Sequence, residues 1–224
     1  MSDSQMQKVR EDFDTIAPFQ KEKWDRNSHY NDFLLENLPR NCQHILEIGC
    51  GIGTLSRLLA ERSKNVTAID LSPKTIEIAQ NLSTSYTNID FQVADVLEAK
   101  FLDEHFDAIV SVATLHHVPL QQVLPKLKSA LKTGGKLLVV DLSRIGNVDD
   151  FIIGSIAFPL SKILNVFHNG FTKPSKEARE AWANHAKTDY YLTFSEAKQI
   201  YQSHFEKAVV ERCLFFRYSI IWEK

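Results

Sequence analysis

Cysteine is scarce in this 224-residue chain, which has three cysteines in all. Cys42, Cys50 and Cys213 are too few for a disulfide framework, and they form no CxxC pair or Cys/His cluster with the spacing of a zinc site. We therefore expect reduced thiols, no metal and a cytoplasmic location. The N-terminus also lacks a basic segment followed by an apolar core, so we expect no secretory signal.

The chain also lacks a large excess of positive or negative charge. The formal net charge is −2, with 24% charged and 44% hydrophobic residues, which is ordinary for a globular protein. No basic stripe with interleaved aromatic residues supports binding to nucleic acid. The length suits one domain, residues 1–224, with a modest insertion.

A hydrophobic run long enough to cross a membrane is also not expected. Residues 151–161 carry no charge, but Gly154, Pro159 and Lys162 interrupt the run before it reaches the ~20 residues of a span. Three interpretations remain open for this segment: a helix buried against the sheet, an apolar roof over a substrate pocket, or a contact with lipid or a second subunit. We expect residues 146–192 to form a lid, which would also contain Trp182, His185, Tyr190 and Tyr191.

The pattern that is present alternates short apolar strands with amphipathic helices. Residues 1–40 are expected to form a helical cap, and Ser72 with Pro73 is typical of a helix start. The pattern predicts strands at 45–49, 65–70, 89–95, 106–112 and 136–142, and helices at 54–63, 74–82 and 120–132. Such alternation indicates βαβ crossovers and a mostly parallel sheet.

The C-terminal part predicts a different ending for this sheet. Thr193 and Glu196 have the spacing of a capping box, so a helix is expected over 193–204. Residues 208–216 and 217–224 are two β-rich runs too close together for a helical crossover, which indicates an antiparallel pair. The predicted fold class is α/β, a doubly wound seven-stranded sheet with helices on both faces and an antiparallel C-terminal hairpin.

The stretch "ILEIGCGIGTLS" carries the first functional signal. Gly49, Gly51 and Gly53 are spaced G-x-G-x-G, and Thr54 stands where a dinucleotide fingerprint has its third glycine. Glu47, two residues before the first glycine, would place a carboxylate near the turn, which disfavours an anionic pyrophosphate. The turn thus favours a cationic or amine-bearing ligand.

This stretch resembles the first motif of the class I S-adenosylmethionine-dependent methyltransferases, and the resemblance extends over residues 42–142 and the C-terminal tail. In that family acidic or polar residues follow strands two and three, where this chain has Asp70 for the ribose and Asp95 beside the adenine. The resemblance therefore implies S-adenosylmethionine as cofactor and S-adenosylhomocysteine as product. It implies a cofactor site of Glu47, Gly49, Cys50, Gly51, Gly53, Asp70, Leu71, Ala94, Asp95, Val96 and Val112.

The segment "ATLHHVP" after the fourth strand bears on the methyl acceptor. It lacks the Asn/Asp-Pro-Pro-aromatic motif of nucleic-acid amino-methylating relatives, so a small, partly apolar acceptor is favoured. His116 and His117 are candidate catalytic residues, because an imidazole can take a proton near neutral pH. The alternative is that both histidines only pack or hydrogen-bond in the loop.

The leading functional hypothesis is O-, N- or C-methylation by in-line displacement, in which positioning supplies much of the rate. An NAD(P)-dependent oxidoreductase and a non-catalytic cofactor-binding subunit remain alternatives. We expect a monomer or homodimer with no transmembrane span, and peripheral membrane contact is the less favoured option.

Overall fold

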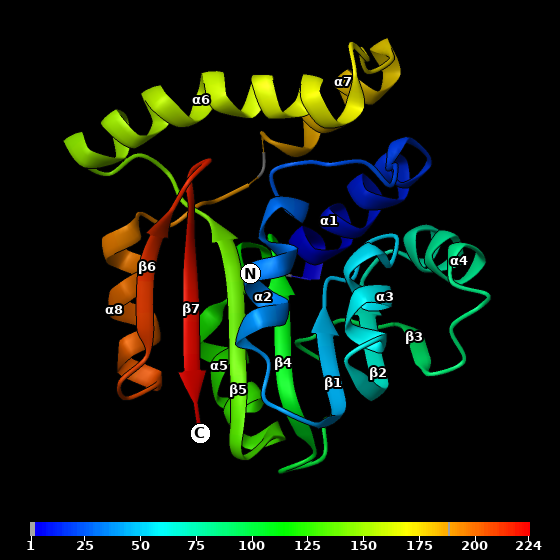
Figure 1. Ribbon diagram of the computed structural model, residues 1–224, viewed down its shortest axis with the longest axis vertical. Helices are drawn as coiled ribbons and strands as arrows, with labels where there is room; N and C mark the ends of the chain where they lie inside the picture. Colours follow the sequence, from blue (N-terminus) through cyan, green and yellow to red (C-terminus); the bar gives the residue numbers. More distant parts are fainter. Residues whose placement is uncertain (1–2, 188) are drawn as a thin grey trace.

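The computed structural model describes residues 3–187 and 189–224 and confirms the predicted sheet. Seven strands follow the spatial order β3-β2-β1-β4-β5-β7-β6 (Figure 1). All neighbours pair in parallel except β5 with β7 and β6 with β7, which are antiparallel. The strands are β1 (Cys42–Ile48), β2 (Ser63–Asp70), β3 (Ile89–Val93), β4 (Phe106–Val112), β5 (Leu131–Leu142), β6 (Val209–Cys213) and β7 (Arg217–Glu223).

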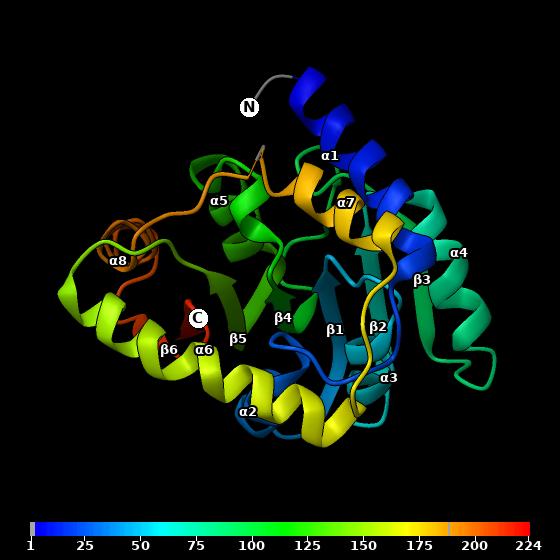
Figure 2. The ribbon, with the colours of Figure 1, turned by 90° about the horizontal axis from the view of Figure 1, so that it is seen from above.

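The central strands are apolar on both faces because helices cover both faces. Ile45, Leu46, Ile109 and Val110 are fully buried, as expected for inner strands of a parallel sheet. On one face α5 (Leu120–Ala130) and α8 (Phe194–His204) enclose a first apolar core, and on the other α2 (Asn31–Asn37), α3 (Thr54–Ala60) and α4 (Pro73–Leu82) enclose a second (Figure 2).

The helix starts follow the capping chemistry read from the sequence. The Ser72 hydroxyl accepts a hydrogen bond from the Thr75 amide, with Pro73 at the first helical position of α4. Thr193 and Glu196 form the expected reciprocal capping box of α8. Both starts are therefore confirmed.

Several predicted boundaries are wrong. The helix expected over 54–63 ends at Ala60, because Ser63 already begins β2 and pairs with Cys42 of β1. The helix expected over 120–132 ends at Ala130, because Leu131 already pairs with Phe106 of β4 and an irregularity in the ladder separates that pair from Ala108 and Lys136. The N-terminal 40 residues are not helical throughout. They form α1 (Asp3–Ile16), two short 3-10 turns (Ala17–Phe19 and Ser28–Tyr30) and α2, with residues 20–27 in irregular structure.

Helix α6 (Val148–Asn169) crosses beyond the carboxyl ends of the strands and leads into α7 (Lys176–His185) (Figure 1). Its inner face is a narrow line of small residues, Gly154, Ala157 and Ser161, with Gly154 against the Phe216 ring. Large apolar side chains elsewhere on α6 are exposed, including Phe151 (62%) and Phe167 (80%). The interpretation of this segment as a buried helix is therefore wrong.

Within the described residues, α6 is also the one helix long and apolar enough to cross a membrane. Only 17% of its most apolar window is buried inside the protein. The criterion for a possible membrane span considers only the length and the composition of the helix. Gly154 and Pro159, which were expected to interrupt this segment, lie inside α6 and do not end it.

Candidate functional site

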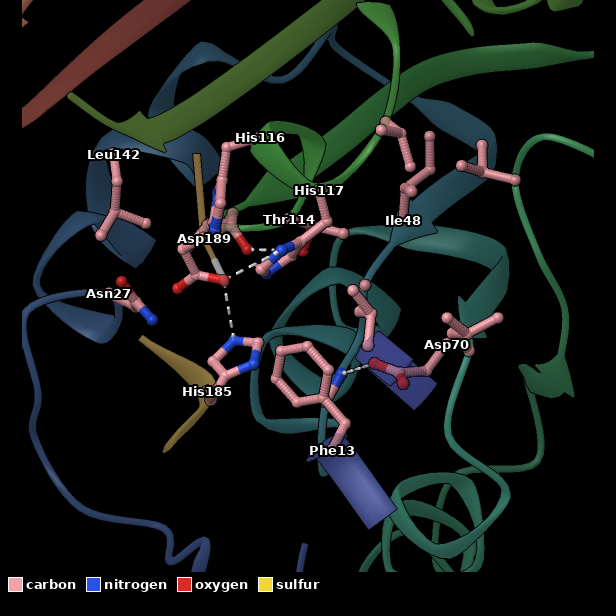
Figure 3. Close-up of a pocket in the computed structure, with 18 of the residues that line it drawn as sticks. Phe13, Asn27, Ile48, Asp70, Thr114, His116, His117, Leu142, His185 and Asp189 are labelled. Carbon is pink, nitrogen blue, oxygen red and sulfur yellow. Dashed lines mark hydrogen bonds and ion pairs between the residues drawn. The ribbon is translucent and has the colours of Figure 1, made fainter. Parts of the chain in front are cut away.

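A cavity of about 370 Å³ opens at the carboxyl ends of the parallel strands (Figure 3). This is the place where ligands bind in open α/β sheets, and the volume is typical of a small-molecule site. Its wall joins two groups of residues. The donor half consists of Gly49, Gly51, Asp70, Leu71, Ala94, Asp95, Val96 and Val112, and the acceptor half of Phe13, Asn27, His116, His117, Leu142, Trp182, His185, Asp189, Tyr191 and Arg217.

The glycine turn connects β1 to α3, and all three of its glycines have positive φ, at +75°, +52° and +78°. A Cβ on Gly49 would lie 1.9 Å from Thr114 Oγ1, and one on Gly53 would lie 2.9 Å from the Phe91 ring. A Cβ on Gly51 would meet only Gln20 Oε1, at 3.9 Å. Gly49 and Gly53 thus serve packing as well as conformation, whereas Gly51 leaves space for a ligand.

Asp70, at the end of β2, connects the glycine turn to the next crossover. One carboxylate oxygen accepts the Gly51 amide at 3.0 Å, and the other accepts the Ser72 amide at 2.9 Å. Burial raises the pKa of Asp70, while the backbone amides of Ser72, Gly51 and Leu71 oppose the rise. The carboxylate is thereby held on the cavity wall.

Glu47 occupies a different place from the one expected. Its side chain is 3% exposed and accepts a hydrogen bond from the Ser56 hydroxyl of α3 at 2.5 Å, so it lies beneath the turn and not on the cavity wall. Burial raises the pKa of Glu47 to about 8, against the opposing hydrogen bond from Ser56. Burial thus favours the neutral form of this carboxyl group in the protein alone, against the negative charge expected near the ligand.

Some of the other predicted cofactor residues line the cavity, and others are buried away from it. Leu71, Ala94, Asp95, Val96 and Val112 line the cavity, and Asp95 Oδ1 accepts the Leu97 amide at 2.8 Å. Cys50 is 5% exposed and packs in the core on the α3 side of the sheet. Gly53 is the N-cap of α3. Neither of these two lines the cavity.

The two candidate catalytic histidines both line the cavity, on the 3-10 turn Leu115–His117 after β4. His116 Nδ1 lies 2.6 Å from Oδ1 of the fully buried Asp141 at the end of β5. Because a carboxylate accepts, Nδ1 is the donor of this hydrogen bond, and in the neutral imidazole the lone pair is on Nε2. Burial, followed by the nearby His116 and His185, lowers the pKa of His117 to about 2, which keeps that imidazole neutral.

Several residues of the cavity wall were not predicted individually as site residues, although Phe13 and Asp189 lie in the predicted cap and lid. Phe13 of α1 packs edge-on against His117 and His185, with ring centroids 5.5 and 4.6 Å away. Asp189 lies between the same two histidines (Figure 3). Arg217 of β7 adds a cation that is 7% exposed. No local motif marks Asp189 or Arg217, because their neighbours in space are distant in sequence.

Only part of the predicted lid, residues 146–192, lines the cavity. Trp182, His185 and Tyr191 line the cavity, as expected for a cover of the pocket. Tyr190 is 65% exposed and does not line it, and neither does α6. The pocket is therefore covered by α1, α7 and residues 189–191.

The sheet order, the antiparallel β7 and the strand-end glycines and carboxylates are those of the class I methyltransferase fold. Residues 45–135 match the sequence profile of the methyltransferase domain family. By its fold and by this profile the chain is similar to the class I S-adenosylmethionine-dependent methyltransferases.

Curated relatives agree with this assignment. The chain is 37% identical over 120 residues to an uncharacterised methyltransferase of Mycobacterium bovis, covering 52% of this chain and 59% of that protein. It is 29% identical over 181 residues to the ubiquinone biosynthesis O-methyltransferase of Dechloromonas aromatica, covering 74% and 77% of the two chains. The chain thus spans about three-fifths of the length of the first of these relatives.

Solved structures share the fold at low sequence identity. A methyltransferase from Aquifex aeolicus has a TM-score of 0.58 at 14% identity, covering 99% of this chain and 98% of that one. A phosphoethanolamine-type N-methyltransferase from Haemonchus contortus, solved with S-adenosylhomocysteine, has a TM-score of 0.59 at 20% identity, covering 82% and 38%. These likenesses show the fold.

Proposed function

We propose that this chain binds S-adenosylmethionine in the donor half of the cavity and transfers its methyl group to a small, partly apolar acceptor in the acceptor half. The observation that carries the proposal is the continuity of the cavity. Asp70 and the glycine turn lie at one side and the histidines at the other, within one cavity (Figure 3). Donor and acceptor could therefore be held next to each other there.

The donor half fits this cofactor in chemistry. The Asp70 carboxylate would accept hydrogen bonds from the ribose hydroxyls, and Asp95 would lie beside the adenine. Gly51 lets the ligand approach the backbone, because nothing but Gln20 Oε1 stands within 4 Å of where a side chain would begin. When bound, the sulfonium supplies an electrophilic methyl group.

The acceptor half supports a nucleophile that has to lose a proton. The Nε2 atom of His116 is the group that could take this proton, whereas the lowered pKa of His117 makes that imidazole a poor base. A hydroxyl and an aliphatic ammonium group both have to lose a proton before they attack, so a base at this place could serve either acceptor. The similarity to an O-methyltransferase favours the hydroxyl class. Val9, Phe13, Leu142 and Trp182 offer apolar contact to the rest of the acceptor.

Titration calorimetry tests the donor assignment directly. We expect S-adenosylmethionine and S-adenosylhomocysteine to bind and NADPH not to bind. Asp70→Asn, which keeps the shape of the side chain, should weaken cofactor binding by ~1–3 kcal/mol through the lost charge-assisted hydrogen bonds. The matched control is Asp90→Asn on exposed β3, which should bind as the parent does. Equal affinity of Asp70→Asn and parent would defeat the assignment.

A screen with methyl-labelled cofactor then tests the acceptor class. Small phenols and aliphatic alcohols should accept label more readily than matched amines. Label appearing mainly in amines would contradict the hydroxyl assignment and leave the donor site intact. A cytoplasmic location and a monomeric or homodimeric state belong to the same proposal, and fractionation with light scattering checks both.

A further inference from the structure

The acceptor half contains a cluster of nitrogen and oxygen ligands that methyl transfer by proximity does not require. One ligand atom from each of His116, His117 and Asp189 lies within 4.8 Å of the other two. Asp189 Oδ1 is 3.5 Å from His117 Nδ1 and also 3.5 Å from His185 Nε2. Figure 3 shows Asp189 between these two histidines, across the cavity from Asp70.

The cluster contains a buried oxygen that lacks a hydrogen bond. The Asp189 side chain is 4% exposed, and its Oδ1 atom has no hydrogen-bond partner among the described residues. Its other oxygen accepts the Tyr191 hydroxyl at 2.5 Å. A buried carboxylate oxygen without a donor is costly, and such an atom in a native structure points to a missing proton, water or ion.

The surroundings of the histidines are those of metal-binding imidazoles. His116 donates Nδ1–H to the buried Asp141, which orients the ring and leaves Nε2 as a ligand. His185 Nδ1 likewise lies 3.5 Å from Asp12 of α1, while its Nε2 faces Asp189. Carboxylates behind ligating histidines fix the tautomer and raise the basicity of the ligand in known metal sites.

We infer that His116, His117, His185 and Asp189 form a binding site for one divalent transition-metal ion of the zinc type. Imidazole and carboxylate together suit zinc, iron, cobalt or nickel, and disfavour magnesium and calcium, which prefer oxygen ligands alone. Bonds of about 2.0–2.1 Å place two ligands of one zinc ion roughly 3–4 Å apart, so small side-chain rotations close the cluster onto an ion.

The position of the site suggests its use, and this step rests on the proposed function. The same residues line the cavity, so an acceptor oxygen could add as a fifth ligand, a coordination number that zinc can adopt. A metal ion there would favour the ionised form of a hydroxyl acceptor, whose proton would leave to water because the ligating imidazole nitrogens could no longer take it. It would also hold that oxygen on the side of the cavity opposite Asp70.

The test measures metal binding without any need for turnover. Protein stripped with a chelator should bind one Zn²⁺ per chain in calorimetry, and Zn²⁺ should raise the melting temperature because it binds the folded state. Asp189→Asn and His117→Gln should each weaken Zn²⁺ binding at least ~10-fold. His168→Gln, which removes an exposed histidine of α6 outside the cluster, is the matched control and should bind as the parent does.

Equal Zn²⁺ affinity in the parent and Asp189→Asn would overturn the site, as would the absence of stoichiometric binding by the parent. Far-ultraviolet circular dichroism and S-adenosylmethionine titration of each variant show that it is folded and that the donor half is intact. Failure of the metal site is thereby separated from failure of the proposed function. Co²⁺-loaded protein tests the open position: catechol should change its visible spectrum, and an unchanged spectrum would overturn the role in acceptor binding.

Discussion

The two halves of the cavity are built in different ways. Every donor-half residue lies between positions 49 and 112, most of them within three residues of the carboxyl end of a strand. The acceptor half draws on α1, the turn after β4, α7, residues 189–191 and β7, from Phe13 to Arg217. One half is a feature of the sheet, and the other exists only once the helices have packed over it.

This difference predicts different consequences of mutation. The donor half depends on backbone conformation and on hydrogen bonds such as Gly51 to Asp70, so changes there should act on cofactor affinity. The acceptor half depends on buried polar groups such as Asp141, so changes there should act on stability and on the acceptor. Variants at Gly51 and Asp141 test the two halves of the cavity, and variants at Glu47 and on α6 test the packing around them.

The largest effect is expected at Gly51. Gly51→Val places a branched side chain in the cavity and should weaken S-adenosylmethionine binding at least ~100-fold, while the strain of the positive φ costs on the order of 1 kcal/mol. The control is Gly134→Val, where φ is +77° and a Cβ would meet nothing within 4 Å. Calorimetry compares the two, and equal cofactor affinities would place the donor site elsewhere.

A smaller effect, on stability, is expected at Asp141. Asp141→Ala removes the acceptor for His116 Nδ1 and for the Leu142 amide, both partly buried, and should lower the free energy of unfolding by about 1–3 kcal/mol. Urea denaturation measures this, with exposed Asp103→Ala as the control, expected within ~0.5 kcal/mol. Cofactor affinity should stay near that of the parent. A large loss of cofactor affinity would show that the two halves are coupled.

Glu47 should make the protein less stable as pH rises. Its folded pKa of about 8 lies above the unfolded value near 4.5, so between these values the unfolded state has released a proton that the folded state retains. The free energy of unfolding therefore falls with increasing pH across this window, by at most ~1.4 kcal/mol per unit. Glu47→Gln should flatten the melting temperature between pH 5 and 8 relative to the parent, and parallel pH profiles would contradict this.

The smallest effect is expected on the outer face of α6. Phe167→Ser should change the free energy of unfolding by no more than ~0.5 kcal/mol, because the side chain is already 80% exposed. The fully buried Ala157 of the same helix is the matched contrast, and Ala157→Asn should destabilise by more than ~1 kcal/mol. Similar melting temperatures for the two variants would show that α6 does not pack through its small residues.

Features that depend on neighbouring residues were predicted correctly from the sequence, and features that depend on tertiary packing were not. Strand ends, the glycine turn and the caps at Ser72 and Thr193 depend on interactions within a few residues, and the structure confirms the sheet and both caps. Glu47 was expected to present a charge to the ligand, but one hydrogen bond to Ser56 and complete burial reverse that expectation. Burial of a particular carboxyl group depends on the packing of α3 onto β1 and is not encoded in its neighbours.

The sequence by itself determined the doubly wound sheet, the antiparallel ending and the glycine turn after the first strand, because periodicity and turn chemistry are local. The tertiary structure alone decided that α6 lies outside the cavity and that Asp189 meets His117 and His185. His117 and Asp189 are about seventy residues apart, and only the packing of α1 and α7 over the strand ends brings them within 3.5 Å. Long-range contacts of this kind depend on how the helices pack, and no local sequence pattern predicts them.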